Sequence, residues 1–268
     1  MTTAAYSWID SHCHPHFPQL GGDFAAVLSR MRENGVSAAL AVATGGGEWA
    51  RVRRMARENP GVIYAACGVH PLSGADEADD ESSLIRVCED AAVLAAGETG
   101  LDFFRGKDSE IRQRRRFAAH IAAARRLKKP LIIHARDSTA EILDMLRAEN
   151  ARDAGGVMHC FTGGKAEMRA ALDLNFVVSF SGILTFKKSD ALRAVAAAAP
   201  ADGYMVETDA PYLSPAPHRG KTNTPGYARF VGEAVAAARG ISAARAAAES
   251  TATFIRLFKP PEPPAAAR

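Results

Sequence analysis

Short apolar runs alternate with longer segments of helical period along almost the whole chain. Nearly every position in the short runs is apolar, as expected for parallel strands that are covered on both faces. The longer segments place apolar residues three or four positions apart, which is typical of amphipathic helices. The predicted strands are Tyr6–Ser11, Ala38–Ala43, Val62–Val69, Ala92–Gly97, Leu131–His134, Gly156–His159, Phe176–Ser181 and Tyr204–Glu207.

Helix boundary signals fall between these runs. Asp23 is a good N-cap for a helix that should stop at Gly35. Near the C-terminus, Gly240 separates two predicted helices, Tyr227–Arg239 and Ser242–Phe258. Each gap between predicted strands is therefore long enough to carry a crossover helix.

Eight such β/α units in 268 residues predict a closed (β/α)8 barrel and not an open doubly wound sheet. A barrel of this kind typically takes about 250 residues as one domain. We expect this domain to span residues 1–259. Residues 260–268 are rich in Pro and Ala, and we expect them to form a disordered tail.

Composition says more about the cellular compartment of the protein than about its function. The chain is 47% hydrophobic and 24% charged, which is ordinary for a globular protein. A net charge of +3 and a pI near 8.7 neither exclude nor favour a nucleic-acid partner. The four cysteines form no C-x-x-C pair, the N-terminus lacks signal-peptide features, and no apolar run is long enough to span a membrane. We expect a cytoplasmic monomer with no membrane partner.

Metal-binding residue types recur at the carboxyl ends of the predicted strands, where barrel enzymes carry their active sites. His12 and His14 alternate along the first strand and should project from the same face. A single histidine at such a position is more often a hydrogen-bonded structural residue. Here four histidines and two carboxylates would crowd one rim, and the carboxylates would repel each other without a cation. The residues at these ends are His12, His14, His70, Glu98, Asp102, His134, Arg136, His159, Glu207 and Asp209.

A set of motifs, several of them five or more residues long, resembles the motifs of one protein family. They include Asp10-Ser11-His12-Cys13-His14, Cys67-Gly68-Val69-His70-Pro71, Gly97-Glu98-Thr99-Gly100-Leu101-Asp102, His159-Cys160-Phe161-Thr162-Gly163, Ser179-Phe180-Ser181-Gly182, Glu207-Thr208-Asp209-Ala210-Pro211-Tyr212-Leu213 and His218-Arg219-Gly220-Lys221. From about Tyr6 to Phe258 the chain resembles the TatD family of metal-dependent deoxyribonucleases, which are amidohydrolase-like (β/α)8 barrels.

The resemblance implies a site for two divalent metal ions, with Zn, Mn or Mg as candidates. One ion would be held by His12, His14, Glu98 and Asp209, and the second by Glu98, His134 and His159. Glu98 would bridge the ions, and Asp209 would also position the metal-activated water and accept its proton. These two carboxylates are the expected catalytic residues.

Four further residues are candidates for contacts with substrate phosphate: His70, Arg136, Arg219 and Lys221. A structural salt bridge to Glu207 or Asp102 is the alternative for the two arginines. A run of arginines, Arg112 and Arg114–Arg116, falls on a predicted outer helix, and we expect it to face solvent.

His16 departs from the family pattern, which usually has Asp two residues after the second histidine of the first motif. It could be an extra ligand or substrate contact, but we expect it to lie in a loop that faces solvent.

The resemblance implies an enzyme that hydrolyses phosphodiester bonds of DNA. We expect a 3′→5′ exonuclease that acts on 3′ ends and prefers single strands, with RNA as an alternative substrate. The same residues could instead serve an amide, lactone or nucleobase hydrolase, as in related barrels. A barrel that binds metal or a nucleic-acid end without turnover is the third alternative.

Overall fold

The computed structural model describes residues 6–262 and 264. In this part of the chain, eight parallel strands form one sheet in which neighbours in sequence are neighbours in space. The strands are β1 (Trp8–Cys13), β2 (Val36–Val42), β3 (Ile63–Cys67), β4 (Val93–Asp102), β5 (Leu131–Arg136), β6 (Gly156–Met158), β7 (Phe176–Phe180) and β8 (Tyr204–Val206).

The sheet closes where the chain after β8 returns to β1. A parallel bridge joins Cys13 to Ala210. The His14 amide donates to the carbonyl of Ala210 at 2.7 Å, and the Asp209 amide donates to the carbonyl of His12 at 3.0 Å. The predicted (β/α)8 barrel is thus confirmed, and its closing bonds hold His12 and His14 beside Asp209.

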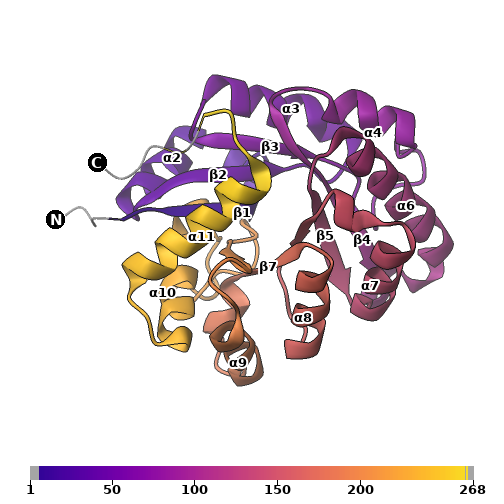
Figure 1. Cartoon of the computed structure of the whole chain (residues 1–268). Helices are drawn as coiled ribbons and strands as arrows, with labels where there is room; N and C mark the ends of the chain where they lie inside the picture. Colours follow the sequence, from indigo (N-terminus) through magenta and orange to yellow (C-terminus); the bar gives the residue numbers. More distant parts are fainter. Residues whose placement is uncertain (1–5, 263, 265–268) are drawn as a thin grey trace.

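Helices surround the strands (Figure 1), so that the crossover connections cover the outside of the barrel. The α-helices are α1 (Pro18–Gly21), α2 (Phe24–Glu33), α3 (Gly46–Glu58), α4 (Glu81–Cys88), α5 (Phe103–Gly106), α6 (Glu110–Leu127), α7 (Thr139–Ala148), α8 (Lys165–Asp173), α9 (Asp190–Ala198), α10 (Ala228–Arg239) and α11 (Ala243–Phe258). Short 3-10 turns are η1 (Lys107–Ser109), η2 (Ala151–Asp153), η3 (Gly182–Thr185) and η4 (Pro225–Tyr227). Among the helices described, none has both the length and the apolar character that a membrane crossing requires.

The last helix, α11, covers the amino-terminal end of the barrel. Its residues Phe254 and Phe258 belong to the same buried cluster as Ile9, Leu40 and other strand residues. The ring of Phe254 lies 5.6 Å from that of Tyr64, near the start of β3. Because α11 occupies this end, the carboxyl end of the barrel is left for a functional site.

The segment after α11 lies partly inside the described residues. Pro260 is buried, and the hydroxyl of Tyr64 donates to the carbonyl of Glu262 at 2.6 Å. Residue 263 and residues 265–268, which make up the rest of the predicted disordered tail, lie outside the described part of the chain.

The predicted helix boundaries hold where local chemistry determines them. Asp23 accepts a hydrogen bond from the amide of Ala26 at 2.9 Å and caps α2. Gly35 and Gly240 adopt φ values of +67° and +65°, in the left-handed region that favours glycine after a helix.

Strand β4 is longer than the predicted strand Ala92–Gly97, because it continues through Glu98 to Asp102. The glycines in this stretch allow close approach of the neighbouring strand. A Cβ on Gly100 would lie 2.1 Å from the carbonyl oxygen of His134 on β5. Glu98 and Asp102 therefore both project from one rigid strand.

The expectation that the arginine run faces solvent is wrong for Arg116, whose side chain on α6 is fully buried. Its guanidinium donates to the carboxylate of Asp79 at 2.8 Å and to the carbonyl of His70 at 2.7 Å. It also donates to the carbonyls of Ser73 and Gly74, at 3.1 and 2.8 Å. Arg116 thus holds the loop after β3, which carries His70.

Candidate metal centre

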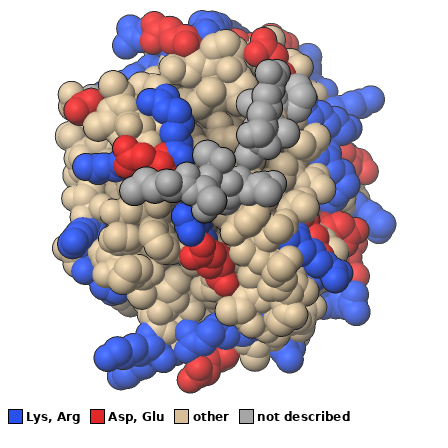
Figure 2. All heavy atoms as spheres, turned by 90° about the vertical axis from the view of Figure 1, so that its left-hand side faces the viewer, with Lys and Arg blue, Asp and Glu red and all other residues tan. Residues whose placement is uncertain are grey.

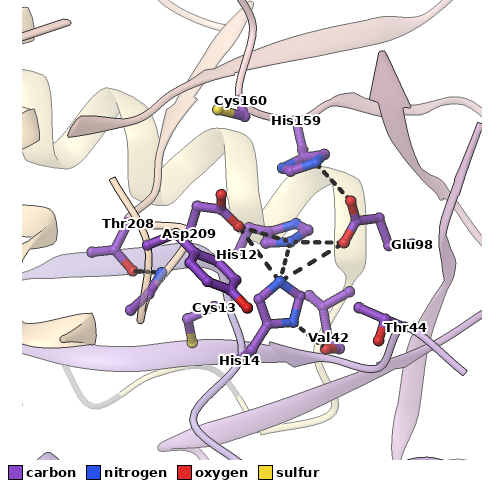
Figure 3. A network of polar contacts seen from close by, with 12 residues as sticks. His12, Cys13, His14, Val42, Thr44, Glu98, His159, Cys160, Thr208 and Asp209 are labelled. Carbon is purple, nitrogen blue, oxygen red and sulfur yellow. Dashed lines mark hydrogen bonds and ion pairs between the residues drawn. The ribbon is translucent and has the colours of Figure 1, made fainter. Parts of the chain in front are cut away.

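Glu98, on β4, lies at the centre of the cluster and presents its two carboxylate oxygens to different histidines (Figure 3). Oε1 lies 3.0 Å from Nε2 of His159 and 2.9 Å from Nδ1 of His134. Oε2 lies 3.4 Å from Nε2 of His12 and 3.8 Å from Nε2 of His14. The carboxylate is therefore placed between two groups of potential ligands.

The first group combines the β1 histidines with Asp209. The Oδ1 atom of Asp209 lies 3.5 Å from Nε2 of His14 and 3.8 Å from Nε2 of His12. The two Nε2 atoms face each other at 3.3 Å. Asp209 adopts φ +58°, a left-handed conformation that an aspartate tolerates better than most residues. These three residues offer ligand atoms within 4.8 Å of one another.

In His14 and His134, the ring nitrogen that points away from the cluster lies next to a hydrogen-bond acceptor. Nδ1 of His14 lies 2.7 Å from the carbonyl oxygen of Val42, which can only accept, so Nδ1 carries the proton and Nε2 a lone pair. Nε2 of His134 lies 3.2 Å from the carboxylate of Asp102, which leaves its Nδ1 free to coordinate. Such outer partners fix the tautomer of metal-binding histidines.

His159 has a similar but looser outer contact. Its Nδ1 lies 3.4 Å from Oε1 of Glu207, a distance and geometry that fall short of a hydrogen bond. Glu207 is fully buried and accepts hydrogen bonds from the amide of Cys160 at 2.8 Å and from the hydroxyl of Ser179. It is therefore held in place by the neighbouring strands and can orient the imidazole.

His70 differs from the other histidines of the cluster. Its Nδ1 accepts a hydrogen bond from the amide of Leu72 at 3.1 Å, so the proton of the neutral ring lies on Nε2. Nε2 faces Oε1 of Glu98 at 3.5 Å and Nδ1 of His134 at 3.3 Å. Burial lowers the pKa of His70 to about 3, so the ring is neutral. We interpret it as a hydrogen-bond donor beside the site and not as a metal ligand, although its position alone would permit coordination.

Asp10 is not among the predicted site residues, but it joins β1 to the segment that follows β8, beside the site. Its buried carboxylate accepts hydrogen bonds from the amide of His12 at 3.2 Å and from the amide and hydroxyl of Thr208 at 2.9 and 2.5 Å. Burial raises its pKa to about 8. Asp10 thereby fixes β1 against the segment that carries Asp209. In the sequence, Asp10 is signalled by its alternation with His12 and His14 and by its place in the motif Asp10-Ser11-His12-Cys13-His14.

The electrostatics of the cluster fit a cation. Burial opposes ionisation of Glu98, but His159 beside it holds the pKa of this carboxyl well below the usual range. Burial likewise opposes ionisation of Asp209, but His14, whose Nε2 lies 3.5 Å from its Oδ1, lowers its pKa. Two ionised carboxylates and several imidazoles thus converge in a buried space. This nitrogen and oxygen donor set suits zinc, manganese or related divalent ions.

The cluster forms one wall of a cavity of about 660 Å³ at the carboxyl end of the barrel. Among the predicted phosphate contacts, His70 and Arg136 line this cavity. Arg219 and Lys221 are exposed and do not line it; Arg219 stacks on Phe186, with its guanidinium carbon 3.6 Å from the ring centroid. Their role in substrate binding stays a prediction.

The proposed salt-bridge partners of the two arginines are wrong. Asp102 instead contacts His134 at 3.2 Å and pairs with Arg105 at 3.1 Å, while Glu207 faces His159. Both carboxylates therefore contact the candidate metal ligands His134 and His159 and do not pair with Arg136 or Arg219.

The expectation that His16 faces solvent is also wrong, because this residue is only 3% exposed. Its Nε2 lies 3.1 Å from the carboxylate of Glu48, which also accepts a hydrogen bond from the amide of Thr44 at 2.7 Å. His16 is not among the described residues that line the cavity. It packs below the site and stabilises the β2–α3 loop.

One face of the molecule carries charged side chains of both signs. Figure 2 shows Lys and Arg side chains interspersed with Asp and Glu over the face that lies on the left of Figure 1. This face has no single sign of charge that would attract a polyanion. At the cavity, Arg105 and Arg136 provide positive charge close to the metal-type ligands.

Comparison with known proteins agrees with this geometry. The family model described as TatD related DNase matches residues 9–259. The chain is 42% identical over 253 residues to the uncharacterized metal-dependent hydrolase YcfH of Escherichia coli K12, an alignment that covers 93% of this chain and 95% of the relative.

More distant relatives extend the comparison. The 3′-5′ ssDNA/RNA exonuclease TatD of Pantoea vagans is 32% identical over 247 residues, covering 90% of this chain and 95% of the relative. The crystal structure of YJJV, a TatD homologue from Escherichia coli K12, superposes with a TM-score of 0.88 at 30% identity, covering 96% of this chain and all of that one (100%). With a matching family model over nearly its whole length and relatives of this similarity, the chain belongs to the TatD family.

Proposed function

We propose that the protein is a metal-dependent phosphodiesterase that removes nucleotides from the 3′ ends of DNA and prefers single strands. The observation that carries the proposal is the position of Glu98, whose two oxygens face separate groups of ligands. Two-metal phosphoesterases place their ions about 3.5–4 Å apart, a gap that one carboxylate can bridge. The exonuclease name of the Pantoea relative supports the choice of substrate.

Two divalent ions, Zn, Mn or Mg, fit the residues present. His12, His14, Asp209 and Glu98 would hold one ion, and Glu98, His134 and His159 the other. When bound, such ions acidify a water molecule and neutralise charge that develops on the phosphoryl group. The buried cluster also excludes bulk water, which strengthens these electrostatic effects.

Asp209 is the residue best placed to accept the proton of the attacking water. Its side chain is 16% exposed, whereas that of Glu98 is 4% exposed, so Asp209 lies closer to the open cavity. Its lowered pKa keeps the carboxylate ionised and able to accept a proton. The hydrogen bonds around Thr208 fix the backbone next to Asp209, so the carboxylate is oriented before substrate binds.

His70 and Arg136 provide the donors for the substrate. The Nε2–H of His70 points toward the ligand cluster, where it can donate to a phosphate oxygen or to the leaving oxygen. Arg136 lies at the end of β5 with an exposed guanidinium and lines the cavity. At this position the guanidinium can donate hydrogen bonds to a phosphate of the substrate.

The direct test compares Glu98→Ala and Glu98→Gln with the parent protein. We expect both variants to lose bound metal and cleavage of an end-labelled single strand while keeping the circular dichroism spectrum of the parent. Glu233→Gln, on α10, is a matched control because its carboxylate pairs with Arg229 on the same helix. Parental rates of oligonucleotide cleavage by Glu98→Ala, with metal present, would contradict the assignment.

The alternative chemistry, hydrolysis of an amide, lactone or nucleobase, is separable by assay. The described residues that line the cavity include no lysine that could carry a bridging carbamate, and Glu98 would take the bridging role instead. A panel of small amides and lactones should therefore be turned over far more slowly than an oligonucleotide. The opposite ranking would assign the protein to that class, and binding of single strands without turnover under Mg, Mn, Co and Zn would make it a binding protein.

A further inference from the structure

The cavity at the metal centre continues into a second groove. This groove, of about 620 Å³, is lined by residues that follow β5 and by the first turn of α7, from Asp137 to Glu141. The two spaces share the lining residues Ala135, Arg136, Thr162 and Ile183. Each volume falls within the range of roughly 300–1,000 Å³ that is usual for small-molecule sites. A continuous path therefore leads from the metal-type ligands to α7.

An exposed aromatic ring stands where the path leaves the metal centre. Phe104, on α5, lines the cavity and is 62% exposed. The guanidinium carbon of Arg136 lies 4.7 Å from its ring centroid, so the cation occupies one position against the ring while most of the surface stays open. A flat apolar surface beside a cation is the combination with which proteins hold a base and its phosphate.

Charge limits how far a phosphate can follow the groove. Arg136 lies in the part that is shared with the cavity, whereas the part beyond it carries the carboxylates of Asp137 and Glu141. A phosphate would be attracted at the junction and repelled further along. The groove thus suits one additional nucleotide and not a long strand.

We infer that the junction of the cavity and the groove, beside Arg136 and Phe104, is a subsite for a second nucleotide. This is the nucleotide linked to the scissile phosphate on the side away from the terminal nucleotide. Its base stacks on Phe104, and Arg136 contacts the phosphate that joins it to the terminal nucleotide. This inference rests on the proposed phosphodiesterase function and adds a substrate-binding residue, Phe104, together with a minimal substrate of two nucleotides.

The test compares substrates that share one leaving-group type. Thymidine 5′-methyl phosphate has an alkoxide leaving group but no second nucleoside, whereas the thymidine dinucleotide and trinucleotide fill one or more further positions. We expect the parent protein to bind the dinucleotide with a KM roughly tenfold lower than that of the methyl ester, since stacking on an aromatic side chain contributes about 1–3 kcal/mol per base. The trinucleotide should show no comparable further gain.

Variants of Phe104 separate stacking from folding. Phe104→Ala should raise the KM for the dinucleotide roughly tenfold, leave its kcat unchanged and leave the methyl ester unaffected. Phe104→Trp should restore the parental KM. Ile255→Ala is a matched control, because this residue is an exposed hydrophobic side chain on α11, at the other end of the barrel.

The outcomes distinguish the subsite from the function on which it rests. Equal effects of Phe104→Ala on methyl ester and dinucleotide, or no effect on either, would overturn the subsite while phosphodiesterase activity remains. A large gain from dinucleotide to trinucleotide would overturn the limit of one additional nucleotide. If the parent protein with bound metal hydrolyses none of these phosphodiesters, the proposed function fails and the subsite fails with it.

Discussion

Replacing Arg116 by Met should destabilise the protein strongly, although the residue lies in an arginine-rich stretch of an outer helix. Methionine replaces the aliphatic part of the arginine side chain but lacks the guanidinium. The buried guanidinium donates hydrogen bonds to Asp79 and to the loop carbonyls of His70, Ser73 and Gly74. Asp79 is 8% exposed and would lose its buried partner.

The expected size follows from these contacts. Removing one partner of a buried ion pair costs about 3–5 kcal/mol, because the other charge stays buried. Asp79 would keep only the exposed Arg115, 3.3 Å away, as a partner. The carbonyls that also lose a donor add to this cost, but water can reach part of the loop. We therefore expect the free energy of unfolding to fall by about 4 kcal/mol, which lowers the melting temperature by roughly 10 °C in a domain of this size.

Urea and thermal unfolding of the metal-free parent and variants would measure the effect. Asp79→Asn should cost less, since Arg116 would keep its carbonyl acceptors. The double variant should show a coupling of at least about 1 kcal/mol, because the two groups share one network. A loss below about 1 kcal/mol for Arg116→Met, or strict additivity with Asp79→Asn, would refute the reasoning.

Three further predictions concern the support of the site. His120 is buried with a pKa lowered by burial to about 4, and it accepts a hydrogen bond from the amide of Val69. The unfolded chain therefore binds a proton first as pH falls below 6.5, and up to about 3 kcal/mol of stability should be lost toward pH 4. In urea titrations over this range, His120→Gln should flatten the pH dependence, and an unchanged slope would contradict the assignment. Asp102→Asn should weaken metal binding by about 10–100-fold, measured by calorimetry, because the tautomer of His134 would no longer be fixed. Parental affinity would show that this contact is dispensable. Gly100→Ala should cost at least about 1–3 kcal/mol, because its Cβ would lie 2.1 Å from a carbonyl oxygen of β5, and an unchanged melting temperature would show that the strands can separate without penalty.

The sequence predicts the architecture because each element carries its own local signal. Apolar runs identify the strands, and Asp23 and Gly240 mark helix boundaries through their own side chain or φ angle. The length of β4 was missed because Gly97 and Gly100 are typical of a turn. Here they serve close strand packing, a property of the neighbouring strand that the local sequence does not contain.

The ligand set is predictable for a related reason. Parallel strands in a barrel bring their carboxyl ends to one rim, so residues that follow strands far apart in sequence meet without any local signal between them. His12 and Glu98, whose facing atoms lie 3.4 Å apart, are an example.

The groups that orient this set are harder to predict, because their partners are backbone carbonyls or single side chains that sequence spacing does not identify. His14 donates to the carbonyl of Val42, and His16 pairs with Glu48. Arg116, on α6, donates to the loop after β3 that carries His70, a segment distant in the sequence. In an isolated helix this arginine would face water, and it is buried only because the loop after β3 exposes several carbonyls that need donors. The stability of the site therefore depends on contacts between connections of neighbouring β/α units, and the Arg116 and Asp79 variants measure that dependence directly.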